Sequence, residues 1–173
     1  MKKAKSALLP LLGGLFMCSV VFAGPDFSGT WRVNAAKSNE DNYPWGQPGH
    51  APKPPGWKKG QPPLISGQIT IEMAGNEMNL FADSAPPAIP LGLREFKFVL
   101  DGNPRTTEAG LMYKASWSGE TLIIILSFPG MDAESFMERR FSISPDRKTL
   151  TMVTRWILNG KLYDVVHVLD RKK

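Results

Sequence analysis

The sequence predicts an all-β domain, an antiparallel up-and-down barrel of about eight to ten strands. Short runs rich in β-branched and aromatic residues recur from Asp26 onward, which is typical of strands. Turn-forming pairs such as Gly75-Asn76 and Asn159-Gly160 separate these runs at close spacing. No convincing helical repeat lies between them. Consecutive hairpins without a crossover helix make an antiparallel sheet, and closure into a barrel removes the exposed edges of that sheet.

Ten runs have the length and composition of strands. Each ends at a cluster of Gly, Pro, Asn, Asp or Ser. The expected strands span residues 27–33, 66–73, 77–82, 93–100, 105–108, 111–117, 121–128, 135–144, 149–158 and 161–169.

The last hairpin can be given a register from its turn. If Asn159-Gly160 forms a two-residue turn, Leu158 lies opposite Lys161, and Arg155 lies opposite Asp164. Opposed residues share a face of the sheet, and a charged pair belongs in water. The other face of this hairpin should therefore point inward, and it carries Trp156, Tyr163, His167 and Arg171.

The same alternation assigns inward positions on the other strands. Residues 122–126 break the rule because they are apolar at every position, which indicates a covered outer side, a partner or an exposed patch. With Trp156, Tyr163 and His167, the side chains expected inside are Trp31, Arg94, Phe96, Phe98, Tyr113, Trp117, Met137, Arg139 and Phe141.

The first 23 residues have the layout of a cleavable secretory signal peptide. Three lysines precede an apolar run, and Val21-Phe22-Ala23 provides small residues at the positions that a signal peptidase reads. Cleavage after Ala23 predicts one mature domain, 24–173, in the periplasm or outside the cell, without a transmembrane segment. Lipidation at Cys18 is a weaker alternative, because Phe16 and Met17 are bulky for that signal.

Charge argues against nucleic acid as a partner. The whole chain has 21 basic and 16 acidic residues, but three lysines and no acid leave with the leader, so the mature net charge is +2. The only cysteine leaves as well, so the stability of an exported domain must come from its core rather than from a disulfide.

One segment does not fit the strand pattern. Residues 46–63 contain six Pro and four Gly, interleaved with basic residues and Trp57. This composition indicates a semi-extended loop between the first two strands. A lid over one end of the barrel and a contact for an envelope partner are the alternatives.

The chain lacks the residues that most enzyme mechanisms require. The mature chain has no cysteine, its two histidines lie far apart, and no nucleophile elbow, phosphate loop or dinucleotide motif occurs. We therefore expect a non-enzymatic protein without a metal or cofactor.

The opening Phe27-Ser28-Gly29-Thr30-Trp31-Arg32-Val33-Asn34 resembles that of exported bacterial proteins with lipocalin-like barrels. More widely, Gly29-Thr30-Trp31 resembles the Gly-x-Trp signature of the calycins, which include lipocalins, fatty-acid-binding proteins and avidins. This resemblance implies that Trp31 packs against an Arg at the end of the last strand, where Arg171 stands, and closes the barrel.

The resemblance also suggests a function, the binding of a small hydrophobic or amphipathic molecule by the residues expected inside. Arg139 and Arg94 could hold its carboxylate, as inward Arg residues do in fatty-acid-binding proteins. An internal pair with an acid, or a one-residue register shift, would explain these Arg residues equally well.

Two other functions remain open. The large side chains could fill the barrel, which would leave an envelope interaction module. His167 on the last strand resembles the haem ligand of nitrobindin-type barrels, although a core histidine bonded to Tyr163 or Thr154 explains it as well.

Overall fold

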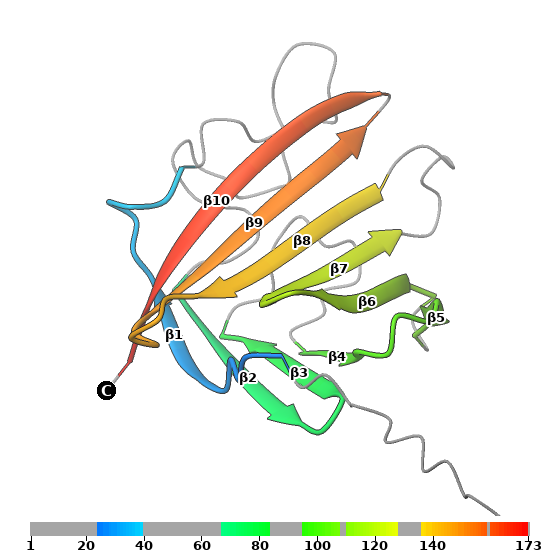
Figure 1. Cartoon of the computed structure of the whole chain (residues 1–173). Helices are drawn as coiled ribbons and strands as arrows, with labels where there is room; N and C mark the ends of the chain where they lie inside the picture. Colours follow the sequence, from blue (N-terminus) through cyan, green and yellow to red (C-terminus); the bar gives the residue numbers. More distant parts are fainter. Residues whose placement is uncertain are drawn as a thin grey trace, which may run out of the picture.

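The computed structural model describes residues 24–39, 67–83, 95–107, 110–127, 136–158 and 160–172 (Figure 1). The proposed leader 1–23, the 46–63 segment and Arg94 lie outside these ranges. The described residues form ten strands and no helix, so none of them belongs to a helix that could span a membrane. The strands are β1 (Gly29–Val33), β2 (Gln68–Ala74), β3 (Glu77–Ala82), β4 (Glu95–Val99), β5 (Arg105–Thr106), β6 (Met112–Ser118), β7 (Thr121–Ser127), β8 (Phe136–Ile143), β9 (Thr149–Leu158) and β10 (Lys161–Arg171).

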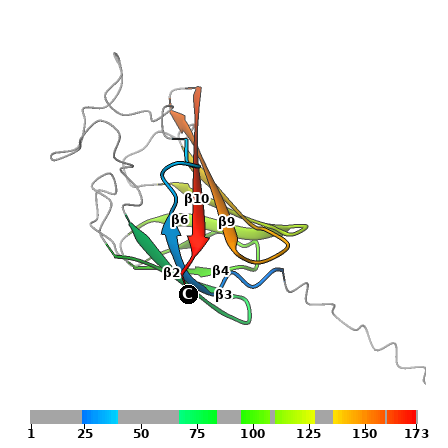
Figure 2. The same cartoon turned by 90° about the vertical axis from the view of Figure 1, so that its left-hand side faces the viewer.

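The strands form one antiparallel sheet in the order β4-β3-β2-β1-β10-β9-β8-β7-β6-β5. Every strand except β4 pairs with the strand that follows it in sequence, and β1 also pairs with β10, so the first and last strands lie side by side. The sheet curls into a half-barrel, as two perpendicular views show (Figures 1 and 2). The predicted all-β, antiparallel meander is confirmed.

Within the described ranges the hydrogen-bonded ladder does not continue from β4 to β5. The expected strand 105–108 begins at Arg105 but ends at Thr106, because the chain turns at Thr107, whose carbonyl accepts the N–H of Gly110 at 2.9 Å. Side chains connect the two edges instead. The Val99 N–H donates to the Tyr113 hydroxyl on β6 (3.2 Å), and the Phe98 ring meets that of Tyr113 edge-on at 5.2 Å.

The β9–β10 register agrees with the prediction at every pair, from Leu158 opposite Lys161 to Thr149 opposite Asp170. On the outer face, Arg155 donates to both carboxylate oxygens of Asp164, at 2.8 and 2.9 Å. These hydrogen bonds hold the pKa of Asp164 below its ordinary value. A shift of one residue would bury this ion pair, so the pair fixes the register.

The continuous apolar run on β7 has a simple explanation. Its even-numbered residues, 122, 124 and 126, are buried on the inner face, whereas Ile123 and Ile125 are half-buried on the outer face. Lys114 and Glu138 flank Ile125 in the sheet. Because the methylene groups of long charged side chains cover neighbouring apolar surface, charged neighbours account for this partial burial.

Trp31 lies where the first and last strands, β1 and β10, pair with each other. It is fully buried, and its indole N–H donates to the carbonyl of Phe27 (2.9 Å). The guanidinium of Arg171 lies 5.2 Å from the centre of this ring and donates to the carbonyl of Ser28. A Cβ at Gly29, where φ is +139°, would stand 3.0 Å from that guanidinium, so only glycine allows this approach. The expected contact between Trp31 and Arg171 is thus present.

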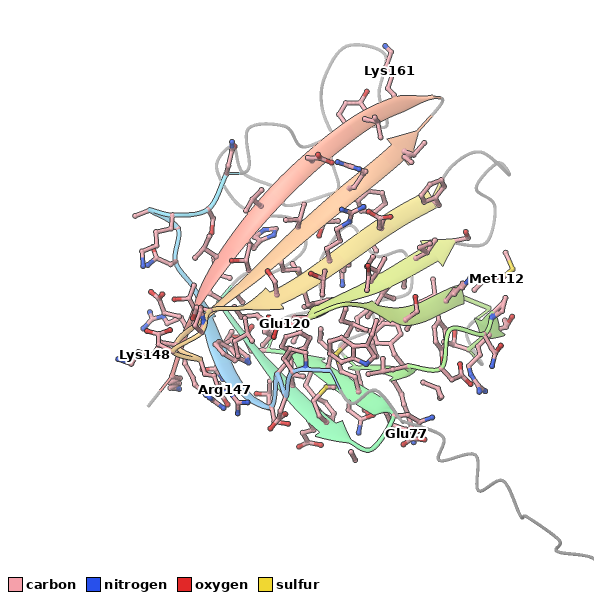
Figure 3. The ribbon with its side chains drawn as sticks, viewed as in Figure 1. Glu77, Met112, Glu120, Arg147, Lys148 and Lys161 are labelled. Carbon is pink, nitrogen blue, oxygen red and sulfur yellow. The ribbon has the colours of Figure 1, made fainter. Side chains whose placement is uncertain are left out.

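The prediction that Arg171 lies inside is wrong, because its side chain is exposed. Arg171 does share a face with Trp31, its partner across the β1–β10 ladder. It occupies the last position of β10, however, where no further row of side chains covers it. Arg147 and Lys148 project at this same end, which we call the turn end, and Lys161 lies at the far end of β10 (Figure 3).

A short N-terminal segment packs beneath the inner face at the turn end. Phe27 is fully buried, with its ring 5.4 Å from that of Trp117 and 6.3 Å from that of Phe141. The backbone of Gly24 lies so close to Trp117 that a Cβ there would come within 2.3 Å of the indole. The aromatic contacts of this segment therefore fill the turn end.

Replacing Arg171 by Gln should lower the free energy of unfolding by about 1–2 kcal/mol, because one exposed cation–π contact and its hydrogen bonds disappear. Chemical denaturation monitored by tryptophan fluorescence measures this change. Lys148→Gln, at the same end and equally exposed, is the matched control and should change stability by less than about 0.5 kcal/mol. Equal effects of the two substitutions would mean that Arg171 does not stabilise the closure.

Candidate functional site

Three buried polar side chains interrupt the apolar inner face in the described part of the chain. They are Arg139 on β8, Thr154 on β9 and His167 on β10, with exposed fractions of 4%, 0% and 0%. Arg139 lies directly opposite Thr154 in the ladder, and Thr154 lies opposite Val165, two residues before His167 on the same face. We call these three residues the polar stripe. It crosses three neighbouring strands diagonally.

The β8 sequence explains why Arg139 faces inward. Met137 and Phe141 are buried on either side of it, whereas Glu138 and Arg140 face outward. Nε of Arg140 donates to the Glu138 carboxylate at 2.7 Å on the outer face. A one-residue shift would bury both of these groups, so the register-shift explanation for Arg139 is excluded.

Apolar rows lie on both sides of the polar stripe. Toward the turn end, Phe141 lies opposite both Leu122 and Met152, and Met152 lies opposite His167. Toward the far end, Met137 lies opposite Trp156, which lies opposite Tyr163. The stripe is therefore embedded in the sheet's apolar face rather than placed at its rim.

Burial and a like charge control the ionisation of the stripe. Burial of His167, followed by the positive charge of Arg139, lowers the pKa of the imidazole to about 4. His167 is therefore neutral near pH 7, with one ring nitrogen as a donor and the other as an acceptor, while Arg139 keeps its charge. The stripe carries one positive charge and can donate hydrogen bonds.

The Thr154 hydroxyl adds a further polar group. It is fully buried and has no hydrogen-bond partner among the described residues. A buried hydroxyl without a partner costs about 1–3 kcal/mol. An acceptor placed between Thr154 and Arg139 would remove this cost. The hairpin register predicts the inward direction of Thr154, but no motif in the sequence assigns this residue to a site.

The structure distributes the other predicted site residues over the whole inner face. Trp117 and Tyr163 are half-buried against the core, Arg171 is exposed at the turn end, and Arg94 lies outside the described ranges. The predicted residues that are buried together are Trp31, Phe96, Phe98, Tyr113, Met137, Phe141 and Trp156.

Burial is complete for the immediate neighbours of His167. Around His167, the side chains of Leu122, Phe141, Met152 and Leu169 retain no exposed surface. A haem could therefore reach His167 only by displacing these side chains. Residual exposure occurs on both sides of the stripe: Trp117 and Ile143 are half-buried toward the turn end, as is Tyr163 toward the far end, where Arg139 and Tyr113 retain 4% and 7%.

Metal binding finds no support in the described ranges, where no group of three or more His, Cys, Asp or Glu side chains occurs. The charge of Arg139 also opposes a second cation, since it already disfavours protonation of His167. The geometry therefore favours an anion over a cation.

The lowered pKa of His167 makes stability depend on pH in a defined window. The unfolded chain binds a proton at this imidazole below about pH 6.5, whereas the folded chain does so only below about pH 4. The stabilisation is complete above pH 6.5 and is lost as the pH falls to 4, a loss of about 3 kcal/mol in the free energy of unfolding.

Chemical denaturation at pH 7 and pH 4 measures this loss, and His167→Gln should remove it. His50→Gln changes the only other histidine and should leave the pH dependence intact. A wild-type dependence that persists in His167→Gln would contradict the assignment to His167.

Comparison with known proteins gives distant likenesses. No protein-family model matches the chain, and no curated protein matches it. Zebrafish ileal bile acid-binding protein, solved with cholic acid, is 14% identical, with 84% of this chain and 98% of that one covered and a TM-score of 0.48. Secretory abundant heat soluble protein 4 from Ramazzottius varieornatus is 14% identical, with 85% and 95% covered and a TM-score of 0.49. Another secretory abundant heat soluble protein from that organism is 13% identical, with 61% and 70% covered and a TM-score of 0.42.

Proposed function

We propose that this chain is an exported, non-enzymatic binding protein for a small hydrophobic or amphipathic molecule that carries a carboxylate. One observation supports this proposal above all: a guanidinium with 4% exposure lies on an otherwise apolar inner face, opposite a buried hydroxyl that has no partner in the described residues.

A carboxylate suits the chemistry of this position. Burying a charge in apolar surroundings costs several kcal/mol unless hydrogen bonds and opposite charge compensate. A guanidinium has five N–H donors in a plane, so Arg139 can serve a ligand carboxylate in addition to a protein neighbour. The Thr154 hydroxyl, in the adjacent position, can donate to the same carboxylate.

The apolar rows beside the stripe would hold the rest of the molecule. Met137, Trp156 and Tyr163 form the adjacent row toward the far end. Each offers a large apolar surface, and burial of such surface contributes about 25 cal/mol per Å². An anionic head at Arg139 and an apolar body against this row describe an amphipathic ligand.

A filled barrel is the second candidate, and the complete burial of Leu122, Phe141, Met152 and Leu169 around His167 favours it. In that case the protein would act through its surface, as an envelope interaction module. The two candidates differ in one measurable property, the binding of small amphipathic carboxylates.

Arg139→Gln should weaken the binding of amphipathic carboxylates at least 10-fold, since the loss of a charge-assisted pair costs about 1.5–3 kcal/mol. Isothermal titration with cis-parinarate and 2-naphthoate measures affinity, and native mass spectrometry shows any co-purified molecule. Arg140→Gln is the matched control, because Arg140 is the adjacent residue on the outer face, and it should change affinity less than twofold. If the protein neither binds these carboxylates nor carries a co-purified molecule, the proposal is rejected and the filled barrel is favoured.

Export rests on the leader, and its processing can be measured directly. The intact mass of the protein from its own envelope should equal that of residues 24–173, with Gly24 at the N-terminus. A lipid-modified product with Cys18 at its N-terminus would contradict cleavage after Ala23 and indicate a membrane-anchored protein.

A further inference from the structure

Basic side chains gather at the turn end, where the β8–β9 turn meets the last residues of β10. The backbone N–H of Arg171 donates to the Lys148 carbonyl at 2.8 Å, and Nη1 of Arg171 donates to the Arg147 carbonyl at 3.4 Å. Lys172 comes next, and its N–H donates to the carbonyl of Thr30 on β1 at 2.8 Å. These backbone contacts bring cations from separate segments to one place.

Two further cations lie beside Asp170 on β10. Arg32 is opposite Asp170 in the β1–β10 ladder, and Nζ of Lys37 lies 3.6 Å from its carboxylate. All of these basic residues are exposed. We call them the basic cluster, which consists of Arg32, Lys37, Arg147, Lys148, Arg171 and Lys172.

Three carboxylates, those of Asp26, Asp146 and Asp170, lie among these cations. The N–H of Ser28 donates to Asp26 at 2.8 Å, and the Ser144 hydroxyl donates to Asp146 at 2.6 Å. The pKa of Asp26 is below its ordinary value, first because of hydrogen bonds from Ser28 and then because of two arginines of the cluster. The carboxylates therefore hold local turns together and neutralise only part of the cluster.

Six cations and three carboxylates leave this end of the molecule with a net charge of +3. Residues 24–173 contain 18 basic and 16 acidic residues, a net charge of +2, so the remainder of that range carries −1. Glu77 and Glu120 lie apart from Arg147 and Lys148 (Figure 3). The net positive charge of the domain is thus concentrated at the turn end, which makes this end attractive to a polyanion.

The β8–β9 turn exposes Arg147 in an unfavourable backbone conformation. Its φ is 55°, a value that glycine adopts readily and other residues rarely adopt. The side chains of Arg147 and Lys148 make no hydrogen bond or ion pair with another described residue, since Arg171 contacts only their backbone carbonyls. The closure at Trp31 therefore does not need these two side chains, and a role at the surface would explain them.

The surrounding surface indicates the class of polyanion. The exposed large hydrophobic side chains of the described residues are Met112 and Leu162, and both lie away from the cluster, Leu162 beside the labelled Lys161 (Figure 3). The cluster thus lacks the apolar centre that a protein interface needs. Every aromatic side chain in the described ranges is buried or half-buried, so none offers an open platform for nucleic acid bases. Anionic lipid headgroups require neither feature, because basic clusters bind them through charge.

We propose that the basic cluster binds the phosphate groups of an anionic phospholipid bilayer, with the turn end of the barrel facing the membrane. Arg147 and Lys148, on the β8–β9 turn, make the principal contacts. The binding is reversible and sensitive to salt, because it is electrostatic. The cluster is separate from Arg139 on the inner face, so this inference does not depend on the proposed ligand.

Vesicle sedimentation with the processed protein tests the inference. Vesicles of equal parts phosphatidylglycerol and phosphatidylcholine should bind at least 10-fold more tightly than vesicles of phosphatidylcholine alone. Raising the NaCl concentration from about 0.05 M to about 0.5 M should weaken this binding at least 10-fold, because the Debye length falls. Equal binding to the two kinds of vesicle, or no binding to either, would overturn the inference.

Two competitors distinguish a bilayer from other sources of phosphate. Inorganic phosphate should displace the protein from the vesicles no better than NaCl of the same ionic strength. Duplex DNA should bind more weakly than the anionic vesicles. Displacement by phosphate beyond the effect of ionic strength would indicate a site for a single anion, and tighter binding of DNA would indicate a nucleic acid surface. Either result would overturn the inference.

A pair of double variants locates the membrane contact. Arg147→Gly combined with Lys148→Gln should weaken binding to anionic vesicles at least 10-fold, since each basic residue near the surface contributes about fivefold. Lys114→Gln combined with Lys161→Gln is the matched control, because it removes the same charge from exposed positions away from the turn end, and it should weaken binding less than threefold.

Thermal unfolding separates binding from folding in these variants. Arg147→Gly alone should not lower the temperature of unfolding, because glycine suits the backbone at this position and the carbonyl that Arg171 contacts is retained. Its weaker binding therefore cannot result from a loss of structure. Equal weakening by the two double variants would mean that overall charge, and not the turn end, attracts the vesicles, and it would overturn the inference.

Discussion

The ion pair between Arg155 and Asp164 on the outer face fixes the register of the longest hairpin, and much of the inner face depends on that register. Because side chains alternate along a strand, keeping this pair in water places Trp156, Thr154 and His167 inside. The pair itself contributes little stability, since exposed ion pairs are worth about 0–1 kcal/mol. The pair matters because a register shifted by one residue would bury both charges and expose the apolar side chains that now face inward.

The inner face carries both a packed core and a buried cation. Trp31, Phe27 and Phe141 have no exposed surface and supply part of the core that a domain without disulfides needs. Burying the guanidinium of Arg139 costs free energy unless hydrogen bonds and opposite charge compensate. Under the proposed function, a ligand carboxylate would add to the interactions that Arg139 already makes.

Tyr113 links the core to the interruption of the sheet. Its ring packs edge-on against Phe98, while its hydroxyl accepts the N–H of Val99 across the two edges that no ladder joins. One side chain therefore takes part both in the core and in holding β4 against β6.

The sequence by itself determined the elements, the hairpin register and the faces of most strands, because alternation and turn residues are local properties. It placed Arg139, Trp156 and His167 inside for this reason, and it identified Trp31 and Arg171 as neighbours through a resemblance. Only the tertiary structure decided how deep each inward residue lies. Arg171 and His167 share a parity on β10, yet one is exposed and the other is fully buried, because depth depends on which rows of other strands cover a position. The side-chain contact of Tyr113 with Val99 and Phe98 across the interruption between β4 and β5 has the same origin, since it joins strands that are not paired in the ladder.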